Sequence, residues 1–217
     1  MVNNTLELAE HGPVIPVIVI DDAARAVDLA SALIAGGIRV LEITLRTPAA
    51  LDAIKAVAQQ VPRAIVGAGT VRTADDAARA KQAGASFAVS PGLTPAVAKG
   101  CASQSLPLLP GIATAGEVMA ATEAGFTFLK FFPANAIGGI PLLSSLASPF
   151  PDVSFCPTGG IGPVNAADYL ALPNVRCVGG SWLVPAKLIE SADWNRITEL
   201  ASAASQLSGV TPGHAHN

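Results

Sequence analysis

Charged and aromatic side chains are scarce in this sequence. Charged residues make up 13% of the chain and aromatic residues 5%, and the net charge of −3 is accompanied by no basic run. Nucleic acids and anionic membranes are bound by clusters of lysine and arginine. The composition therefore argues against a nucleic-acid partner or a membrane partner. A surface this poor in charge suits subunit contacts or an alanine-rich shell of helices.

Hydrophobic residues are plentiful, at 51%, but they form no long run. No stretch reaches the roughly 20 apolar residues of a membrane-spanning helix. Residues 1–11 contain Glu7 and Glu10 and lack both the cationic start and the apolar core of a signal peptide. We therefore predict a cytoplasmic protein.

Cysteine and histidine each occur three times. Cys101, Cys156 and Cys177 lie far apart, which favours reduced thiols over disulfides or a zinc site. Two of the histidines fall in the tail 209–217, which we predict to be disordered. The chain also lacks GxGxxG and GxxxxGK[ST], the signatures of dinucleotide and nucleotide sites. We predict no metal and no cofactor.

What the sequence does contain is a regular alternation of short apolar runs with helical segments. Eight runs are spaced about 23 residues apart, as expected for a strand followed by a short helix. This order requires parallel strands with crossover connections. We predict a single α/β domain over residues 1–217, a closed (β/α)8 or TIM barrel whose lower end is closed by a short helix over 1–11. An open doubly wound sheet is the alternative. The runs are 14–20, 40–45, 64–68, 87–90, 106–109, 128–132, 153–158 and 176–180.

Capping residues between the runs indicate where helices begin. Thr47 precedes a proline, which is favoured in the first turn of a helix. Thr114 lies three residues before Glu117, the spacing of a capping box. The final helix is predicted over 193–207. The predicted caps are Asp21 or Asp22, Thr47, Thr73, Thr94 and Thr114.

The apolar and aromatic run 126–133 carries a lysine at its centre. Strand alternation places Lys130 on one face together with Phe128 and Phe132. A charged amine is unfavourable among aromatic rings, and an uncharged amine is a nucleophile toward ketones. We therefore predict that Lys130 is a catalytic nucleophile. The alternative is a lysine whose stem reaches along the apolar surface to solvent.

The second run ends in three polar residues on one face, Glu42, Thr44 and Arg46. In a barrel of parallel strands, catalytic side chains collect at the carboxyl ends of the strands. We predict that Glu42 transfers a proton and that Arg46 binds a substrate carboxylate. The alternative is a buried structural ion pair between Glu42 and Arg46.

Gly-Gly turns follow the last two runs, at the place where barrel enzymes hold phosphate groups on backbone N–H groups. We predict a phosphate site at Gly159, Gly160, Gly180 and Ser181. The third run ends in two glycines and Thr70, which offers a hydroxyl beside backbone that a ligand can approach. Together with the amine, the carboxylate and the guanidinium, these residues suit covalent chemistry on a phosphorylated keto acid.

Six motifs, taken in order and spacing, resemble the bacterial 2-keto-3-deoxy-6-phosphogluconate (KDPG) aldolase / 4-hydroxy-2-oxoglutarate (KHG) aldolase family. The resemblance covers the chain from about residue 12 to the final helix. It implies a metal-free class I aldolase of the Entner–Doudoroff pathway, on a (β/α)8 barrel and usually a homotrimer. The motifs are 42–47, 67–70, 90–92, 130–133, 158–161 and 179–183.

The resemblance also implies a role for each predicted site residue. Lys130 would form the Schiff base and Glu42 would act as the general acid and base. Arg46 and Thr70, with Lys130, would bind the pyruvate carboxylate, and the residues of the two Gly-Gly turns would bind phosphate. The implied products are pyruvate and glyceraldehyde 3-phosphate from KDPG, and pyruvate and glyoxylate from KHG.

One residue departs from the family pattern. The family commonly has glutamate after Phe-Phe-Pro-Ala, where this chain has Asn135. We expect a local adjustment of the loop, with an effect on rate or substrate preference. Two other functions fit the same residues: a phosphosugar isomerase or epimerase, which needs no imine, and a non-catalytic sugar-phosphate binding protein.

Overall fold

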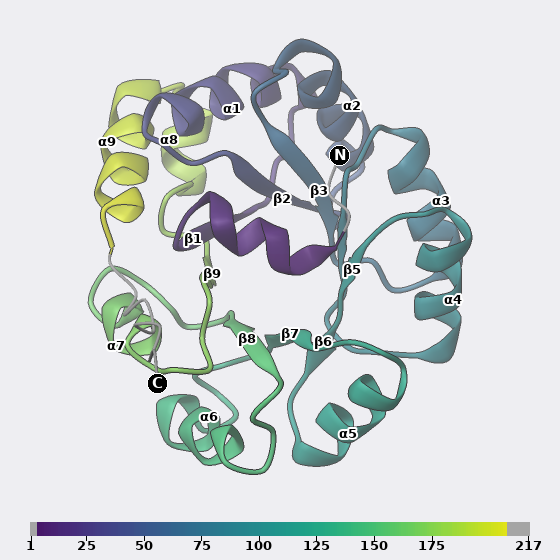
Figure 1. The fold of residues 1–217 in the computed structure, drawn as a ribbon. Coiled ribbons are helices and arrows are strands. Elements are labelled where there is room, and N and C mark those ends of the chain that lie inside the picture. The colour runs from purple at the N-terminus through teal and green to yellow at the C-terminus, as the bar shows by residue number, and fades with distance from the viewer. Residues whose placement is uncertain (1–3, 208–217) are drawn as a thin grey trace.

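A computed structural model describes residues 4–207 of the chain. The predicted disordered tail, 209–217, lies outside the described residues. Strands occupy the centre of the molecule and helices surround them (Figure 1). The strands are β1 Val14–Ile18, β2 Val40–Thr44, β3 Ile65–Gly69, β4 Ala88–Val89, β5 Leu108–Leu109, β6 Gly111–Ile112, β7 Phe128–Phe131, β8 Ser154–Pro157 and β9 Val178–Gly180. The helices are η1 Thr5–His11, η2 Ala23–Arg25, α1 Ala26–Ala35, α2 Ala50–Gln60, α3 Ala74–Gln82, α4 Pro95–Ser103, α5 Ala115–Glu123, α6 Gly139–Ala147, α7 Ala166–Leu170, α8 Ala186–Glu190 and α9 Trp194–Ser205.

Hydrogen bonds divide the strands into two sheets. The larger sheet has the order β5-β4-β3-β2-β1-β9 and curls through half a barrel, and the smaller has the order β6-β7-β8. All strand pairs are parallel. The prediction of a closed (β/α)8 barrel is therefore wrong. The parallel strands and their alternation with helices are confirmed, and each of the eight predicted runs overlaps a strand.

Two interruptions separate the sheets. The first lies at Pro110, which has no N–H to donate to a ladder: β5 on one side of it pairs with β4, whereas β6 on the other side pairs with β7. At the second, β8 and its following turn meet the β9 segment through two isolated bridges, Phe155 with Val175 and Thr158 with Gly179. Apolar runs record burial but not hydrogen-bond partners, so the sequence pattern did not reveal these breaks.

The two faces of the strands pack into separate hydrophobic clusters. Leu41 and Ile43 of β2 and Leu129 of β7 belong to the outer cluster, which the surrounding helices cover. Val40 and Phe128 belong to a smaller inner cluster. This alternation is the predicted one, because successive side chains of a strand point to opposite faces. The polar face of β2 therefore points inward, as predicted.

The helix predicted near the N-terminus is present as the 3-10 helix η1. Asn4 caps it, and its side-chain oxygen accepts hydrogen bonds from the N–H groups of Leu6 and Glu7. Leu8 is fully buried in the inner cluster with residues of β1, β2 and β7. In Figure 1 this helix, in purple, crosses the centre of the ring of strands.

Most of the predicted helix starts are confirmed. Thr73 and Thr114 each form a capping box, and Thr94 caps α4 before a proline. The start predicted at Thr47 is wrong, because α2 begins at Ala50. The Thr47 hydroxyl instead donates to the carbonyl of Ile20, so it ties two chain segments together rather than capping a helix.

Within residues 4–207, the helices are too short or too polar to cross a lipid bilayer.

Candidate active site

The predicted nucleophile and the predicted proton-transfer residue contact each other. Lys130 lies on β7 and Glu42 on β2, and Lys130 Nζ donates a hydrogen bond to Glu42 Oε1 at 3.2 Å. Their side chains are 5% and 4% exposed. The alternative of a structural Glu42–Arg46 pair is wrong, because the partner of Glu42 is Lys130. The alternative of a lysine that reaches solvent is wrong as well.

The aromatic surroundings predicted for Lys130 are only part of its environment. The Phe132 ring centroid lies 5.3 Å from Lys130 Nζ, and Phe128 belongs to the inner cluster on the same face. The sequence suggested an amine among rings, whereas the structure adds a carboxylate. Glu42 is therefore placed to accept a proton from Lys130 Nζ and to return it. That exchange is what a lysine nucleophile needs before it attacks.

Gly69, at the end of β3, makes room for the Glu42 side chain. A Cβ atom at position 69 would lie 2.3 Å from Glu42 Oε1 and 2.7 Å from its Cγ. These distances are far below ordinary contact, so any larger residue would displace the carboxylate. From the sequence, we expected this glycine to let a ligand approach the backbone. In the structure, the Glu42 side chain fills the space beside it.

Arg46 and Thr70 form a second pair at the carboxyl ends of β2 and β3. Arg46 Nε donates to the Thr70 hydroxyl at 3.1 Å. Thr70 has a φ of 60°, an uncommon conformation for a residue with a side chain. Arg46 is exposed, and it makes no ion pair within residues 4–207. Its guanidinium is therefore available to a carboxylate from solution.

A cavity of about 190 Å³ joins Arg46 to both Gly-Gly turns. All four residues of the predicted phosphate site line it, together with Phe132. Lys130, Glu42 and Thr70 are not among its lining residues, but Phe132 and Arg46 link them to it through the contacts above. The predicted residues thus form one buried pair, Lys130 with Glu42, and one pair at the surface, Arg46 with Thr70, beside one open cavity.

The two Gly-Gly turns differ in why they need glycine. Gly159 and Gly160, after β8, have φ values of 102° and 73°, which residues with side chains rarely adopt. Gly180 ends β9, and a Cβ there would lie 1.8 Å from the ring of Trp182. The first turn therefore needs glycine for its backbone conformation and, at Gly160, also for space, because a Cβ there would lie 2.5 Å from Asn135 Cβ. The second turn needs glycine for packing.

Sequence reasoning missed several residues that shape this region. Phe132, Thr158 and Val17 line the cavity, and Thr158 fills the space above Gly179. Phe132 and Thr158 carried a signal, because they lie within the motifs 130–133 and 158–161. Val17 carried none, because it lies near the carboxyl end of β1, away from every motif. Thr44, which shares the inward face, instead donates a hydrogen bond to the carbonyl of Ile18 at 2.8 Å.

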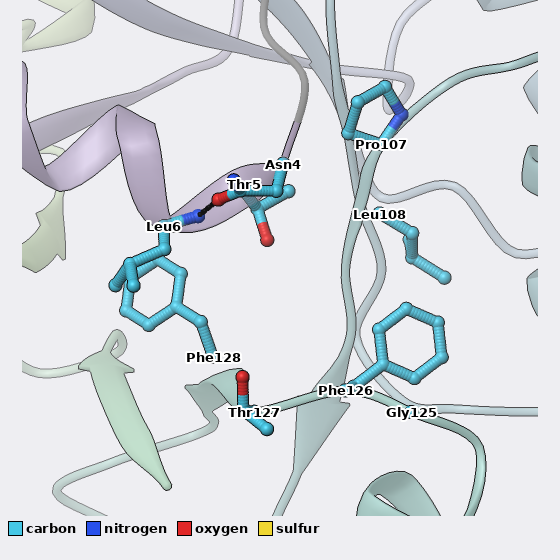
Figure 2. A pocket seen from close by; sticks show the side chains of 9 residues that line it. All are labelled: Asn4, Thr5, Leu6, Pro107, Leu108, Gly125, Phe126, Thr127 and Phe128. Atoms are coloured by element: carbon cyan, nitrogen blue, oxygen red, sulfur yellow. Dashed lines mark hydrogen bonds between the residues drawn. The ribbon is translucent and has the colours of Figure 1, made fainter.

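A larger cavity, of about 420 Å³, lies at the opposite ends of the strands (Figure 2). Leu108 of β5, Phe128 of β7 and the start of η1 line it. None of the lining residues is charged, and none is a predicted site residue. It therefore does not suit a phosphorylated keto acid.

Comparison with known proteins gives one consistent result. The family model described as KDPG and KHG aldolase matches residues 5–200. The chain is 54% identical to 2-dehydro-3-deoxy-phosphogluconate aldolase of Pseudoalteromonas atlantica, over 91% of this chain and 92% of that protein.

Two solved structures are similar over nearly their whole length. One is KDPG aldolase from Legionella pneumophila, with pyruvate captured as a covalent carbinolamine intermediate; its TM-score is 0.91 at 47% identity, covering 93% of this chain and 98% of that one. The other is the Zymomonas mobilis 2-keto-3-deoxy-6-phosphogluconate aldolase with 3-phosphoglycerate, with a TM-score of 0.90 at 50% identity, covering 94% and 96%.

Proposed function

The chain belongs to the KDPG and KHG aldolase family, and on that premise we propose that it cleaves KDPG to pyruvate and glyceraldehyde 3-phosphate through a Schiff base on Lys130. The observation that carries the proposal is the buried contact between Lys130 Nζ and Glu42 Oε1. A lysine with its own proton acceptor is equipped to become a nucleophile without a metal ion.

The first half of the reaction forms the Schiff base. Glu42 takes a proton from Lys130, and the free amine attacks the C2 ketone of the substrate. Glu42 returns its proton to the hydroxyl of the resulting carbinolamine, which leaves as water, so an iminium ion forms and Glu42 is a carboxylate again. The covalent pyruvate adduct in the Legionella pneumophila relative is an intermediate of the same type.

The second half breaks the carbon–carbon bond. Glu42, directly or through one water molecule, removes the proton of the C4 hydroxyl. The electrons of the C3–C4 bond move to the iminium nitrogen, so the aldehyde leaves and an enamine stays on Lys130. Protonation of the enamine at C3 and hydrolysis release pyruvate and restore the amine.

Arg46 and the Gly-Gly turns orient the substrate at its two ends. Arg46, with Thr70, binds the carboxylate beside the reacting ketone. Gly159, Gly160, Gly180 and Ser181 bind the phosphate at the far end of the substrate. Because phosphate binding is remote from the bond that breaks, its energy can hold the reacting carbons in place.

A second substrate follows from the same chemistry. KHG has the same 2-keto-4-hydroxy arrangement without the phosphate, and the family model includes KHG aldolases. We propose that the enzyme also cleaves KHG, to pyruvate and glyoxylate, with weaker binding because the turns have no phosphate to hold. We further propose a cytoplasmic homotrimer, which the low surface charge and the family resemblance support.

Borohydride trapping tests the proposal directly. The enzyme is incubated with pyruvate and borohydride, and its peptides are analysed by mass spectrometry. We expect the reduced adduct on Lys130, none on Lys99 or Lys187, and none in a Lys130→Ala variant. An adduct on another lysine would overturn the assignment of Lys130. Turnover that survives borohydride would favour an isomerase or epimerase, and binding without turnover would favour a sugar-phosphate binding protein.

A further inference from the structure

The turn after β8 is held in place by a side chain outside the predicted site. Asn165 donates a hydrogen bond from Nδ2 to the carbonyl of Gly160 at 3.1 Å. Its Oδ1 accepts a hydrogen bond from the N–H of Gly162 at 2.8 Å. One side-chain amide therefore bridges two backbone groups of the turn, with a donor on one and an acceptor on the other.

Asn165 makes these bonds instead of the N-cap hydrogen bond expected from its position before α7. It occupies the N-cap position of α7, where asparagine commonly accepts from the first backbone N–H groups of the helix. No such cap bond is present in α7, whereas Thr73 and Thr114 both cap their helices in the expected way. The side chain of Asn165 thus serves the preceding turn rather than its own helix.

The bond to Gly160 determines which way the next peptide group points. In a trans peptide, the C=O and the N–H lie on opposite sides. Because Asn165 holds the carbonyl of Gly160, the N–H of Ile161 points away from Asn165, and Ile161 lines the cavity. Within residues 4–207, the N–H groups of Gly160 and Ile161 have no acceptor. They are available to an anion.

We propose that Asn165 is a positioning residue that presents the backbone N–H of Ile161 to the substrate phosphate, next to the N–H of Gly160, whose own peptide is held by the bond from the Asn135 N–H to the carbonyl of Gly159. The inference rests on the proposed function, and it adds a residue that does not itself touch the substrate. Asn165 sets the orientation of the peptide that does. Its loss should therefore affect phosphorylated substrates and leave the chemistry at Lys130 unchanged.

Asn135 provides a matched control on the other side of the same turn. Its backbone N–H donates to the carbonyl of Gly159 at 3.0 Å, a bond that any residue can make. Its side-chain Oδ1 accepts a long hydrogen bond, 3.4 Å, from the hydroxyl of Tyr169 and bonds no group of the turn. Asn135→Ala removes the same side-chain amide as Asn165→Ala without removing a bond to the turn.

The test compares KDPG with KHG in wild-type enzyme and in Asn165→Ala, Asn165→Asp and Asn135→Ala. We expect Asn165→Ala to raise KM for KDPG by about 10-fold, the effect of one lost hydrogen bond. Its kcat on KDPG and its kcat/KM for KHG should change less than about 2-fold. Asn165→Asp should raise KM further, because it places a carboxylate beside the carbonyl of Gly160 and near the phosphate.

Inhibition by inorganic phosphate supplies a second readout that does not depend on the reaction with KDPG. With KHG as substrate, phosphate should inhibit wild-type enzyme and Asn135→Ala equally and Asn165→Ala about 10-fold less well. Equal losses on KDPG and KHG would make Asn165 a purely structural residue and overturn the proposal. So would Asn165 variants with unchanged KM and unchanged phosphate inhibition. A wild-type enzyme that cleaves neither keto acid would instead refute the proposed function.

Discussion

The larger sheet and the smaller sheet carry different parts of the site. The six-stranded sheet and the turns at its strand ends bring Glu42, Arg46, Thr70 and the turn after β9. The three-stranded sheet brings Lys130, and the turn with Gly159 and Gly160 follows it. The proposed nucleophile and its proton acceptor therefore belong to different sheets, and so do the two halves of the phosphate site.

In the part of the chain that the structure describes, the two sheets share no continuous ladder of backbone hydrogen bonds, but side-chain contacts connect them. The Lys130–Glu42 ion pair reaches from β7 to β2, and the cavity of about 190 Å³ lies between the turns that follow β8 and β9. Neither sheet holds the proposed site by itself. The proposed function therefore depends on how the two sheets are placed relative to each other.

The largest effect is expected from removing the charge that the larger sheet presents to Lys130. Glu42→Gln keeps the shape of the side chain but cannot accept a proton from the lysine or from the C4 hydroxyl. Loss of a general base typically lowers kcat by about 10²- to 10⁴-fold. Turnover of KDPG and the yield of the borohydride-trapped adduct should both be measured, with thermal unfolding as the control for folding.

The Glu42→Gln variant shows which step of the reaction needs the carboxylate that the larger sheet supplies. We expect turnover to fall far more than the yield of trapped adduct, because trapping allows long incubation. If adduct formation falls as much as turnover, Glu42 serves mainly to hold and deprotonate Lys130. Near-normal turnover would show that the smaller sheet carries the chemistry without help from the larger.

A smaller effect is expected from displacing the same carboxylate without changing it. Gly69→Ala adds a Cβ 2.3 Å from Glu42 Oε1, so the carboxylate must leave its present position beside Lys130 Nζ. A misplacement of about 1 Å can lower the rate by about 100-fold. Steady-state kinetics on KDPG should therefore show a drop in kcat.

Gly116→Ala is the matched control for this substitution. A Cβ at position 116, in α5, meets nothing within 4 Å. Alanine in a helix is favoured over glycine by about 0.5–1 kcal/mol, so this variant should be slightly more stable and fully active. Equal kcat in both variants would contradict the role assigned to Gly69.

The smallest effect concerns two thiols, one of which lies where the sheets meet. A hydrogen bond with Cys156 of β8, and then burial, raise the pKa of Cys177, which stands beside β9, well above 9.0. Burial raises the pKa of Cys101, on α4, from 9.0 to about 11. Above pH 9 the unfolded chain loses these protons while the folded protein keeps them, so stability falls as pH rises.

Thermal unfolding between pH 8 and 10.5 tests this effect. The midpoint should fall with pH by a few degrees in the wild type. It should fall less steeply in Cys177→Ala and in Cys101→Ala, because each lacks one of the thiols. The cavity left by either substitution shifts the midpoint at every pH and does not alter the slope. Identical slopes in all three proteins would contradict the protonation difference.

Much of the local structure could be predicted from the chain. The apolar runs predicted strands because alternating burial leaves a direct pattern, and Thr73 and Thr114 predicted helix starts because capping is a local interaction. The helix start predicted at Thr47 was wrong because the Thr47 hydroxyl donates to the carbonyl of Ile20, a residue 27 positions away. That contact has no signature in the neighbouring sequence.

For the candidate site, the sequence predicted several of the residues but not the contacts between them. Lys130, Glu42 and Arg46 could be chosen because a polar residue at the inward face of a strand end is conspicuous. Their partners could not, since the pairing of Glu42 with Lys130 joins residues 88 positions apart. Asn165 was missed because an asparagine before a short helix predicts an ordinary cap.

By itself, the sequence determined the order of parallel strands and helices, the inward faces of those strands and the residue types available for chemistry, because each depends on near neighbours in the chain. Only the tertiary structure decided that the strands form two sheets, that Glu42 pairs with Lys130 rather than Arg46, and that Asn165 serves the turn before it. Those outcomes depend on distances between segments far apart in the chain. Such distances follow from packing and from the hydrogen bonds that Pro110 cannot make, rather than from any local pattern.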